Sequence, residues 1–172
     1  DKVVDIPATA KNVGETTLST TLVYGDYKIS TIEHLLSALA GTGVDNCIID
    51  CDGPEIPIMD GSSTQFVFLI QTAGIVEQNA VKKFVYVTKS VQVQRDDAVA
   101  RIKPYDGFRV TFTLEFDHPV YNKYPHSASI DFSQTSFIRE VSRARTFGLM
   151  DDLEKLKKMN LALGANSVSY TH

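Results

Sequence analysis

The chain has 172 residues, of which 43% are hydrophobic and 22% are charged. That length can bury a hydrophobic core without disulfides or structural metals, and the composition excludes collagen-like, low-complexity and disordered proteins. Seventeen lysine and arginine residues against 21 acidic residues give a formal net charge of −4, which provides no basic surface for nucleic acid. We therefore expect one globular domain or two small ones, and no nucleic-acid partner.

The apolar runs and the cysteines bear on the cellular compartment. The longest apolar runs, such as 66–70, are far below the roughly 20 residues that a membrane helix requires, and no signal segment is recognisable at Asp1. We expect a soluble protein that is not membrane-embedded.

Cys47 and Cys51 lack the further Cys or His residues of a disulfide framework or a zinc ribbon, so we interpret them as buried thiols in a reducing cytoplasm.

The first predicted element is a β-hairpin. Strand-like residues at 17–23 and 27–30 flank Tyr24, Gly25 and Asp26. Gly25 can adopt the positive φ that a tight turn requires. These two stretches are therefore expected to pair as antiparallel strands.

A helix of about ten residues is expected after the hairpin. Apolar residues from Ile32 to Leu39 follow helical spacing, and Ser30 with Glu33 has the spacing of a capping box. Gly41 is placed to end this helix as its C′ residue. The pattern thus puts Glu33 in the first turn of the helix.

The remainder of the first half alternates extended and helical patterns. Residues 44–51 predict a largely buried strand. Residues 53–61 predict a loop, because two prolines and flanking glycines prevent regular hydrogen bonding. A second helix is expected at about 63–73, with Gly74 at its end.

The second half has mostly an alternating pattern. Alternation predicts four strands separated by Asp, Gly and Pro turns, at 84–94, 99–103, 109–116 and 128–132. Two helices are expected to close the chain, one from Ser133 to about Arg143 and one from Asp151 to about Lys158. This order of elements predicts an α+β fold with two units, residues 1–80 and 81–172, each a sheet covered on one face by helices.

Glu33 and His34 are the most informative candidates for chemistry. They are adjacent in the first turn of a helix whose other face is rich in leucine. A histidine near a helix N-terminus favours its neutral, metal-binding form. The residue types alone leave two interpretations open: a capping-box glutamate beside an ordinary exposed histidine, or two members of a catalytic metal site.

Other polar residues favour structural roles. Glu55 and Asp60 lie among apolar residues of the proline-containing loop, where carboxylates can brace backbone N–H groups. Thr146 follows a predicted helix end, from which a hydroxyl can donate to a developing oxyanion. His118 and His126 stand at turn or strand-end positions, and no multi-histidine zinc spacing occurs in the sequence.

Several strings of the sequence resemble those of a known enzyme family. They are LSTTL at 18–22, ISTIEHLLSALAG at 29–41, DN at 45–46, EIPIMDGS at 55–62 and SRARTFG at 142–148. In this order they are similar to the UDP-3-O-acyl-N-acetylglucosamine deacetylases, zinc amidohydrolases of lipid A synthesis in Gram-negative bacteria. The resemblance runs from Asp1 to about Ala165.

The resemblance implies a fold, a reaction and a set of site residues. The implied fold is a two-unit α/β sandwich, in which the helices of two α+β domains are packed between two sheets. His34 matches a zinc ligand, and Glu33 matches the general base that deprotonates the zinc-bound water as it attacks the acetamide carbonyl. Thr146 matches the residue that stabilises the oxyanion, while Phe147 and Leu18 match substrate-binding residues. The implied substrate is UDP-3-O-acyl-N-acetylglucosamine, and the implied location is the cytoplasm.

The resemblance also implies that this chain is an interior piece, incomplete at both ends. The remaining zinc ligands and the acid histidine that protonates the leaving amine have no match in it, so we expect them in an absent segment. The tail at 166–172 departs from the family pattern. The alternative is a non-catalytic α+β scaffold that binds a nucleotide sugar, an acyl chain or a protein partner, and zinc content per chain would separate the two.

Overall fold

The computed structural model describes residues 3–115, 119 and 121–148. These residues form a mixed α+β structure with three two-stranded antiparallel sheets and short helices, which confirms the α+β class. They divide into two compact units. The first contains the residues up to Ile75 and those from Phe137 onward, and the second contains Val76–Ser136.

The first unit begins with a 3-10 helix, η1 (Ala10–Asn12), and a β-hairpin. β1 (Leu22–Tyr24) pairs with β2 (Tyr27–Ile29), and the last residue of β1 faces the first residue of β2. Gly25, in the turn between them, has a φ of 59°, which glycine adopts without strain. The predicted hairpin and the role of Gly25 are confirmed, although both strands are shorter than expected.

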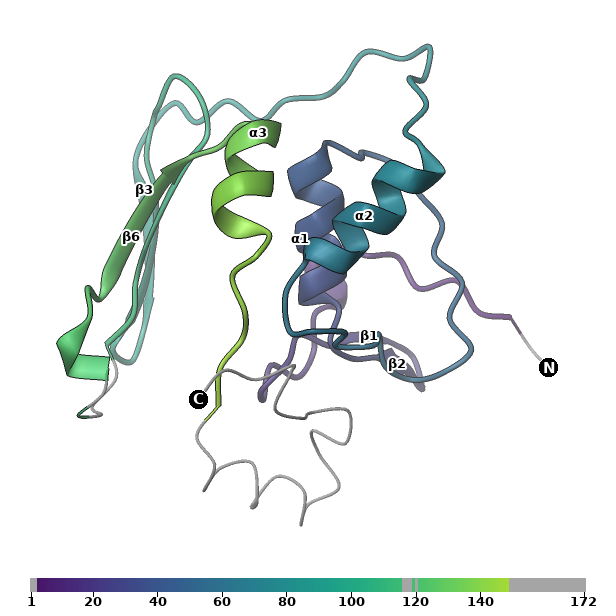
Figure 1. Cartoon of the computed structure of the whole chain (residues 1–172), viewed down its shortest axis with the longest axis horizontal. Coiled ribbons are helices and arrows are strands. Elements are labelled where there is room, and N and C mark those ends of the chain that lie inside the picture. Colours follow the sequence, from purple (N-terminus) through teal and green to yellow (C-terminus); the bar gives the residue numbers. More distant parts are fainter. Residues whose placement is uncertain (1–2, 116–118, 120, 149–172) are drawn as a thin grey trace. The chain divides into compact units, whose positions relative to one another are not determined.

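Two helices pack side by side in the first unit (Figure 1). α1 spans Glu33–Thr42 and α2 spans Thr64–Ala73, so both predicted helices are confirmed, as is Gly74 at the end of the second. All the buried apolar residues of the described chain lie in this unit, and they are Leu22, Ile32, Ala38, Ile56, Phe66, Val67 and Phe137. The hairpin, the two helices and the segment at Phe137 therefore form the hydrophobic core.

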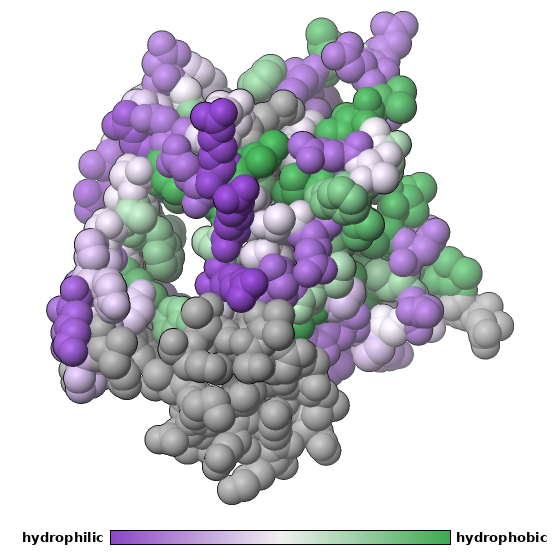
Figure 2. All heavy atoms as spheres, in the orientation of Figure 1, coloured by the Kyte–Doolittle hydropathy of each residue, from purple (hydrophilic) through white to green (hydrophobic). Residues whose placement is uncertain are grey.

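α2 also leaves apolar side chains at the surface. Phe68 and Leu69 are exposed, and Figure 2 shows hydrophobic residues at the surface in the region of α2. One face of this helix is therefore left uncovered by the described residues.

The C-terminal end of α1 differs from the sequence prediction. The helix ends at Thr42, and Gly43 has a φ of 82°, so Gly43 and not Gly41 takes the left-handed position that follows a helix. Gly41 lies inside α1, where a Cβ atom would overlap the ring of Phe137. Glycine at position 41 therefore allows the close approach of Phe137 to α1.

Residues 44–51 do not form the predicted strand. They contain no regular structure, and Ile48 is 91% exposed. Cys47 and Cys51 are also exposed, so the prediction of buried thiols is wrong. A strand needs a neighbour to pair its backbone N–H and C=O groups, and no strand of the described part pairs with this segment.

The second unit consists mainly of two β-ribbons. β3 (Val91–Arg95) pairs with β4 (Ala98–Ile102), and β5 (Arg109–Thr113) pairs with β6 (Ser127–Asp131), all antiparallel. The four predicted strands are confirmed, except that 84–90 lies outside β3. The alternating pattern therefore located the four paired strands, although it placed the start of the first one too early.

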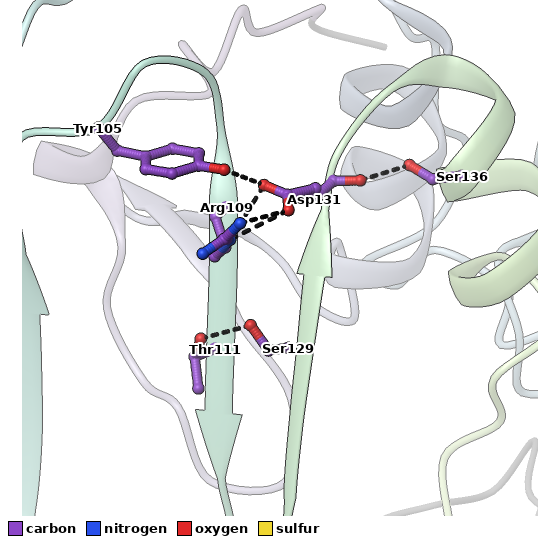
Figure 3. A network of polar contacts seen from close by, with 6 residues as sticks. All are labelled: Tyr105, Arg109, Thr111, Ser129, Asp131 and Ser136. Atoms are coloured by element: carbon purple, nitrogen blue, oxygen red, sulfur yellow. Dashed lines mark hydrogen bonds and ion pairs between the residues drawn. The ribbon is translucent and has the colours of Figure 1, made fainter.

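One face of the β5–β6 ribbon carries polar pairs (Figure 3). Asp131 accepts hydrogen bonds from the Arg109 guanidinium and the Tyr105 hydroxyl, both at 2.7 Å. The bond from Arg109 is the main cause that holds the pKa of Asp131 below its ordinary value, and the bond from Tyr105 is the second cause. The hydroxyls of Thr111 and Ser129 form the next pair, 2.8 Å apart. Because these side chains are exposed, the network helps to set the strand register more than it adds stability.

The chain returns to the first unit through a short helix. α3 (Gln134–Ser136) continues as a π-helix, η3 (Phe137–Val141). The Oγ of Ser133 accepts a hydrogen bond from the N–H of Ser136 at 3.1 Å, which is N-cap geometry. The helix predicted from Ser133 is confirmed, although it ends before Arg143.

Some sequence predictions fall outside the described residues. These are the helix from Asp151 to about Lys158, the tail at 166–172, and the surroundings of His118 and His172. None of the described helices has the length and apolar composition that a membrane span requires.

Candidate functional site

The carboxylate of Glu33 is held by the backbone of a preceding loop. Glu33 is the first residue of α1, and its Oε2 accepts a hydrogen bond from the N–H of Thr20 at 2.9 Å. The N-cap residue, Ile32, makes no side-chain capping bond, and Ser30 pairs instead with the loop at Glu55. The predicted capping box is therefore wrong, because the Glu33 carboxylate is directed toward Thr20.

His34 and Leu18 lie at the same end of α1 as Glu33. His34 follows Glu33 in the first turn and is half-buried. Successive side chains of a helix diverge by about 100°, so the imidazole and the carboxylate face different sides. Leu18 lies two residues before Thr20, is 62% exposed and has a φ of 62°. Glu33 and His34 are thus neighbours on α1, and Leu18 belongs to the loop whose Thr20 N–H binds Glu33.

A second cluster forms around Asp60. Its Oδ1 accepts hydrogen bonds from the N–H and the hydroxyl of Ser62, at 3.1 and 2.7 Å, and its Oδ2 lies 3.6 Å from the guanidinium of Arg145. Partial burial raises the pKa of Asp60, but the bonds from Ser62 and the charge of Arg145 outweigh it and lower the pKa. The prediction that Asp60 braces a turn is confirmed, and Asp60 also holds the segment before Thr146.

The backbone at Thr146 is fixed by the same loop. Its N–H donates a hydrogen bond to the carbonyl of Gly61 at 2.8 Å. The carbonyl of the buried Ser142 accepts a bond from the hydroxyl of Thr64, also at 2.8 Å. Thr146 is half-buried and the adjacent Phe147 is exposed. This segment is therefore anchored at two points to the start of α2 and the loop before it.

One loop connects the two clusters. Near its start, Oε1 of Glu55 accepts a hydrogen bond from the hydroxyl of Thr31 at 2.8 Å, and Thr31 lies two residues before Glu33. At its end, Gly61 binds the backbone of Thr146. A stretch from Glu55 to Gly61 spans at most about 20 Å when fully extended. Glu33 and Thr146 make no direct hydrogen bond in the described part of the chain, so this loop links them.

Strained backbone conformations occur within the motif strings. Among the described residues of the first unit, Leu18, Thr31 and Met59 have positive φ values of 62°, 59° and 56° without being glycine. Such conformations cost on the order of 1–3 kcal/mol each and cluster at functional sites. The three residues lie in three different strings that carry the family resemblance, which favours the first unit as the site of function.

The described residues do not by themselves assemble a metal centre. They contain no group of three His, Cys, Asp or Glu side chains that could hold a metal ion. His126, in the second unit, lies edge-on to Tyr121 of the 3-10 helix η2 (Tyr121–Lys123), with ring centroids 5.7 Å apart. A catalytic zinc ion requires three protein ligands, so the described residues do not complete such a site, and His34 is only a candidate for one ligand.

Comparison with known proteins decides the family. The family model "LpxC: UDP-3-O-acyl N-acetylglycosamine deacetylase" matches residues 1–170. The chain belongs to the LpxC family. The resemblance seen in the motif strings is thereby confirmed.

Two LpxC relatives give the extent of the match. The UDP-3-O-acyl-N-acetylglucosamine deacetylase of Hahella chejuensis is 59% identical over 166 residues, which are 96% of this chain and 55% of that protein. The protein of the same name from Methylococcus capsulatus is 58% identical over 163 residues, 95% of this chain and 54% of that protein. The chain thus spans about half the length of the curated relatives it matches.

Sequence reasoning named candidate site residues but missed the groups to which they bond. The LpxC family is zinc-dependent, and Glu33 and His34 are candidates because of their place in the motif. The bond from Thr20 to Glu33 spans 13 residues, and the bond from Thr31 to Glu55 spans 24. Rules based on local residue spacing do not predict contacts over such separations.

Proposed function

We propose that this chain forms the part of a zinc-dependent deacetylase that removes the N-acetyl group from UDP-3-O-acyl-N-acetylglucosamine in lipid A biosynthesis. One observation carries the proposal. In a chain of the LpxC family, Glu33 and His34 open α1, and the Glu33 carboxylate is held 2.9 Å from the N–H of Thr20. The reaction takes place in the cytoplasm of a Gram-negative bacterium.

Glu33 acts as the general base. Its Oε2 accepts the bond from Thr20, whereas its Oε1 makes no hydrogen bond to any described residue. Oε1 can therefore accept a proton from the water that attacks the acetamide carbonyl. The bond from Thr20 restrains the side chain, so that the accepting oxygen is already in place when the substrate binds.

Thr146, Phe147 and Leu18 contact the substrate. The hydroxyl of Thr146 donates to the oxyanion that develops on the carbonyl, and the bond between its N–H and Gly61 restrains its position. Phe147 and Leu18 present exposed apolar side chains, Phe147 against the substrate and Leu18 at the mouth of the site.

His34 supplies one zinc ligand. A neutral imidazole nitrogen is among the ligands that zinc prefers. Zinc, when bound, lowers the pKa of its water toward neutrality and polarises the carbonyl. The other protein ligands and the histidine that protonates the leaving amine belong to residues outside the described part.

The finer architecture belongs to the same proposal. Residues 1–80 and 81–172 contribute to two α+β domains whose helices are packed between two sheets, and further residues of the protein complete both domains. The exposed Phe68 and Leu69 on α2 support this arrangement, because a second layer would cover them.

A chimera tests the proposal. In it, this chain replaces the matching 166-residue stretch of the Hahella chejuensis relative. We expect the chimera to bind zinc stoichiometrically and to release acetate from the acylated UDP-sugar. Glu33→Gln should keep the zinc and lower kcat by on the order of 10²–10⁴-fold, because a carboxamide cannot accept the proton.

Glu77→Gln is the matched control, since Glu77 is an exposed glutamate of the second unit. It should leave kcat unchanged. Near-normal kcat in the Glu33→Gln chimera would contradict the proposal. A chimera that folds by circular dichroism and holds zinc, but releases no acetate, would favour the non-catalytic scaffold that binds a nucleotide sugar, an acyl chain or a protein.

A further inference from the structure

Thr31 has a backbone conformation that its own side chain disfavours. It is only 5% exposed and stands two residues before Glu33, with a φ of 59°. A positive φ is a genuine outlier for a β-branched residue, since the branched Cβ crowds the backbone. Such a conformation persists only when the surrounding structure enforces it.

Glu55 is placed to enforce it. Its Oε1 accepts a hydrogen bond from the Thr31 hydroxyl at 2.8 Å. The backbone around Glu55 is itself fixed, because the N–H of Ser30 donates to the carbonyl of Pro54 at 2.9 Å and the N–H of Ile56 donates to the carbonyl of Ser30 at 3.0 Å. The carboxylate therefore reaches Thr31 from a braced segment.

The turn at Thr31 decides where α1 begins and where Glu33 is directed. Immediately after it, the N–H of Ile32 donates to the carbonyl of Thr20 at 3.3 Å. One residue later, Oε2 of Glu33 accepts the bond from the N–H of Thr20 at 2.9 Å. Both polar backbone groups of Thr20 are thus bound by the first residues after the turn.

We propose that Glu55 is a positioning residue, which holds Thr31 in its left-handed conformation and thereby fixes the direction of the Glu33 carboxylate. The hydrogen bond of the Glu55 carboxylate goes to the Thr31 hydroxyl and not to Glu33 or His34, so Glu55 acts through the backbone. The expected effect of Glu55 on turnover rests on the proposed function. The expected effect of Glu55 on the start of α1 does not depend on that function.

The experiment compares Glu55→Ala with Glu55→Gln in the chimera defined above. Gln keeps a carbonyl oxygen that can accept the Thr31 bond, whereas Ala cannot. We expect Ala to speed amide hydrogen exchange at Ile32 and Leu36, whose N–H groups bond to Thr20 and Ile32. We expect it to lower kcat by on the order of 10- to 100-fold with little change in KM, since a misplaced base slows the chemical step. Gln should restore both.

Thr31→Gly gives a second, independent test. Glycine adopts a positive φ without support, so Glu55→Ala should have no further effect on exchange or kcat in the Thr31→Gly background. The proposal is overturned if Glu55→Ala leaves amide exchange, kcat or both unchanged. It is also overturned if Glu55→Gln behaves like Glu55→Ala, or if the effect of Glu55→Ala persists undiminished in the Thr31→Gly background. Failure of the proposed function would show separately, as normal turnover in the Glu33→Gln chimera.

Discussion

Asp60 joins two segments of the first unit through a single carboxylate. Its Oδ1 binds Ser62 twice and its Oδ2 faces Arg145. Asp60→Ala should lower the free energy of unfolding of the chimera by about 1–3 kcal/mol, because the N–H and hydroxyl of Ser62 lose their acceptor. Asp60→Asn keeps an acceptor and should cost less, since Arg145 is 41% exposed and its ion pair is screened. Urea denaturation of both variants measures the difference.

The pH dependence of Asp60→Asn follows from the lowered pKa of Asp60, whose ordinary value is 3.8. A carboxyl with a lower pKa in the folded state stabilises the fold above its unfolded value, and loses that contribution as the pH falls through its folded value. The stability gap between parent and Asp60→Asn should therefore be constant near neutral pH and should shrink below about pH 4. A gap independent of pH would contradict an ionised Asp60 in the folded chain.

Candidate site residues could be named from the sequence, but their contacts could not. Ser30 and Glu33 have capping-box spacing, and that rule presumes a helical path through the residues between them. Thr31 has a positive φ, so Ser30 is drawn into an extended pairing with Glu55 and the Glu33 carboxylate is free to reach Thr20. Neither Gly nor Asn stands at position 31 to signal this turn, so no local feature of the sequence predicts it.

The substitution Gly41→Ala tests how closely α1 packs against Phe137. In most helix interiors a change from Gly to Ala stabilises by about 0.5–1 kcal/mol. Here the added Cβ would overlap the ring of Phe137, so Gly41→Ala should instead destabilise the chimera by about 1–3 kcal/mol. Thermal or urea unfolding provides the measurement.

Two further variants isolate the contact. A Cβ atom added at Gly53 would meet no other atom within 4 Å, so Gly53→Ala should change stability by less than about 0.5 kcal/mol. Adding Phe137→Leu to Gly41→Ala should recover part of the loss, because the smaller side chain makes room for the methyl group. Equal stability of Gly41→Ala and the parent would show that α1 and Phe137 are not packed this closely.

Elements with local signals were predictable, and elements that depend on distant partners were not. α1, α2 and the two β-ribbons follow from helical or alternating spacing and from turn residues close to them in sequence. The run at 44–51 has the composition of a strand, but no strand of the described part pairs with it. Its apolar pattern indicates burial without saying what would cover it, so both the strand and the burial were mispredicted.

Burial differs between the two units. The buried apolar residues described all lie in the first unit, while every residue of β3, β4 and β5 in the second is exposed. A two-stranded ribbon is at best marginally stable without further packing. The alternating sequence pattern identified these strands. It could not show that no described residues cover their apolar sides, which include Val93 and Phe112.

The metal content of the 172-residue chain by itself tests how much of the site it carries. Of the zinc ligands in the proposed function it supplies only His34, and zinc affinity depends on several preplaced, deprotonated ligands. We expect this chain to bind zinc far more weakly than the chimera and to release no acetate, as measured by zinc titration and an acetate assay on both proteins. Tight, stoichiometric zinc with turnover in the 172-residue chain would contradict this, and His118, His126 and His172 would then be the candidate ligands.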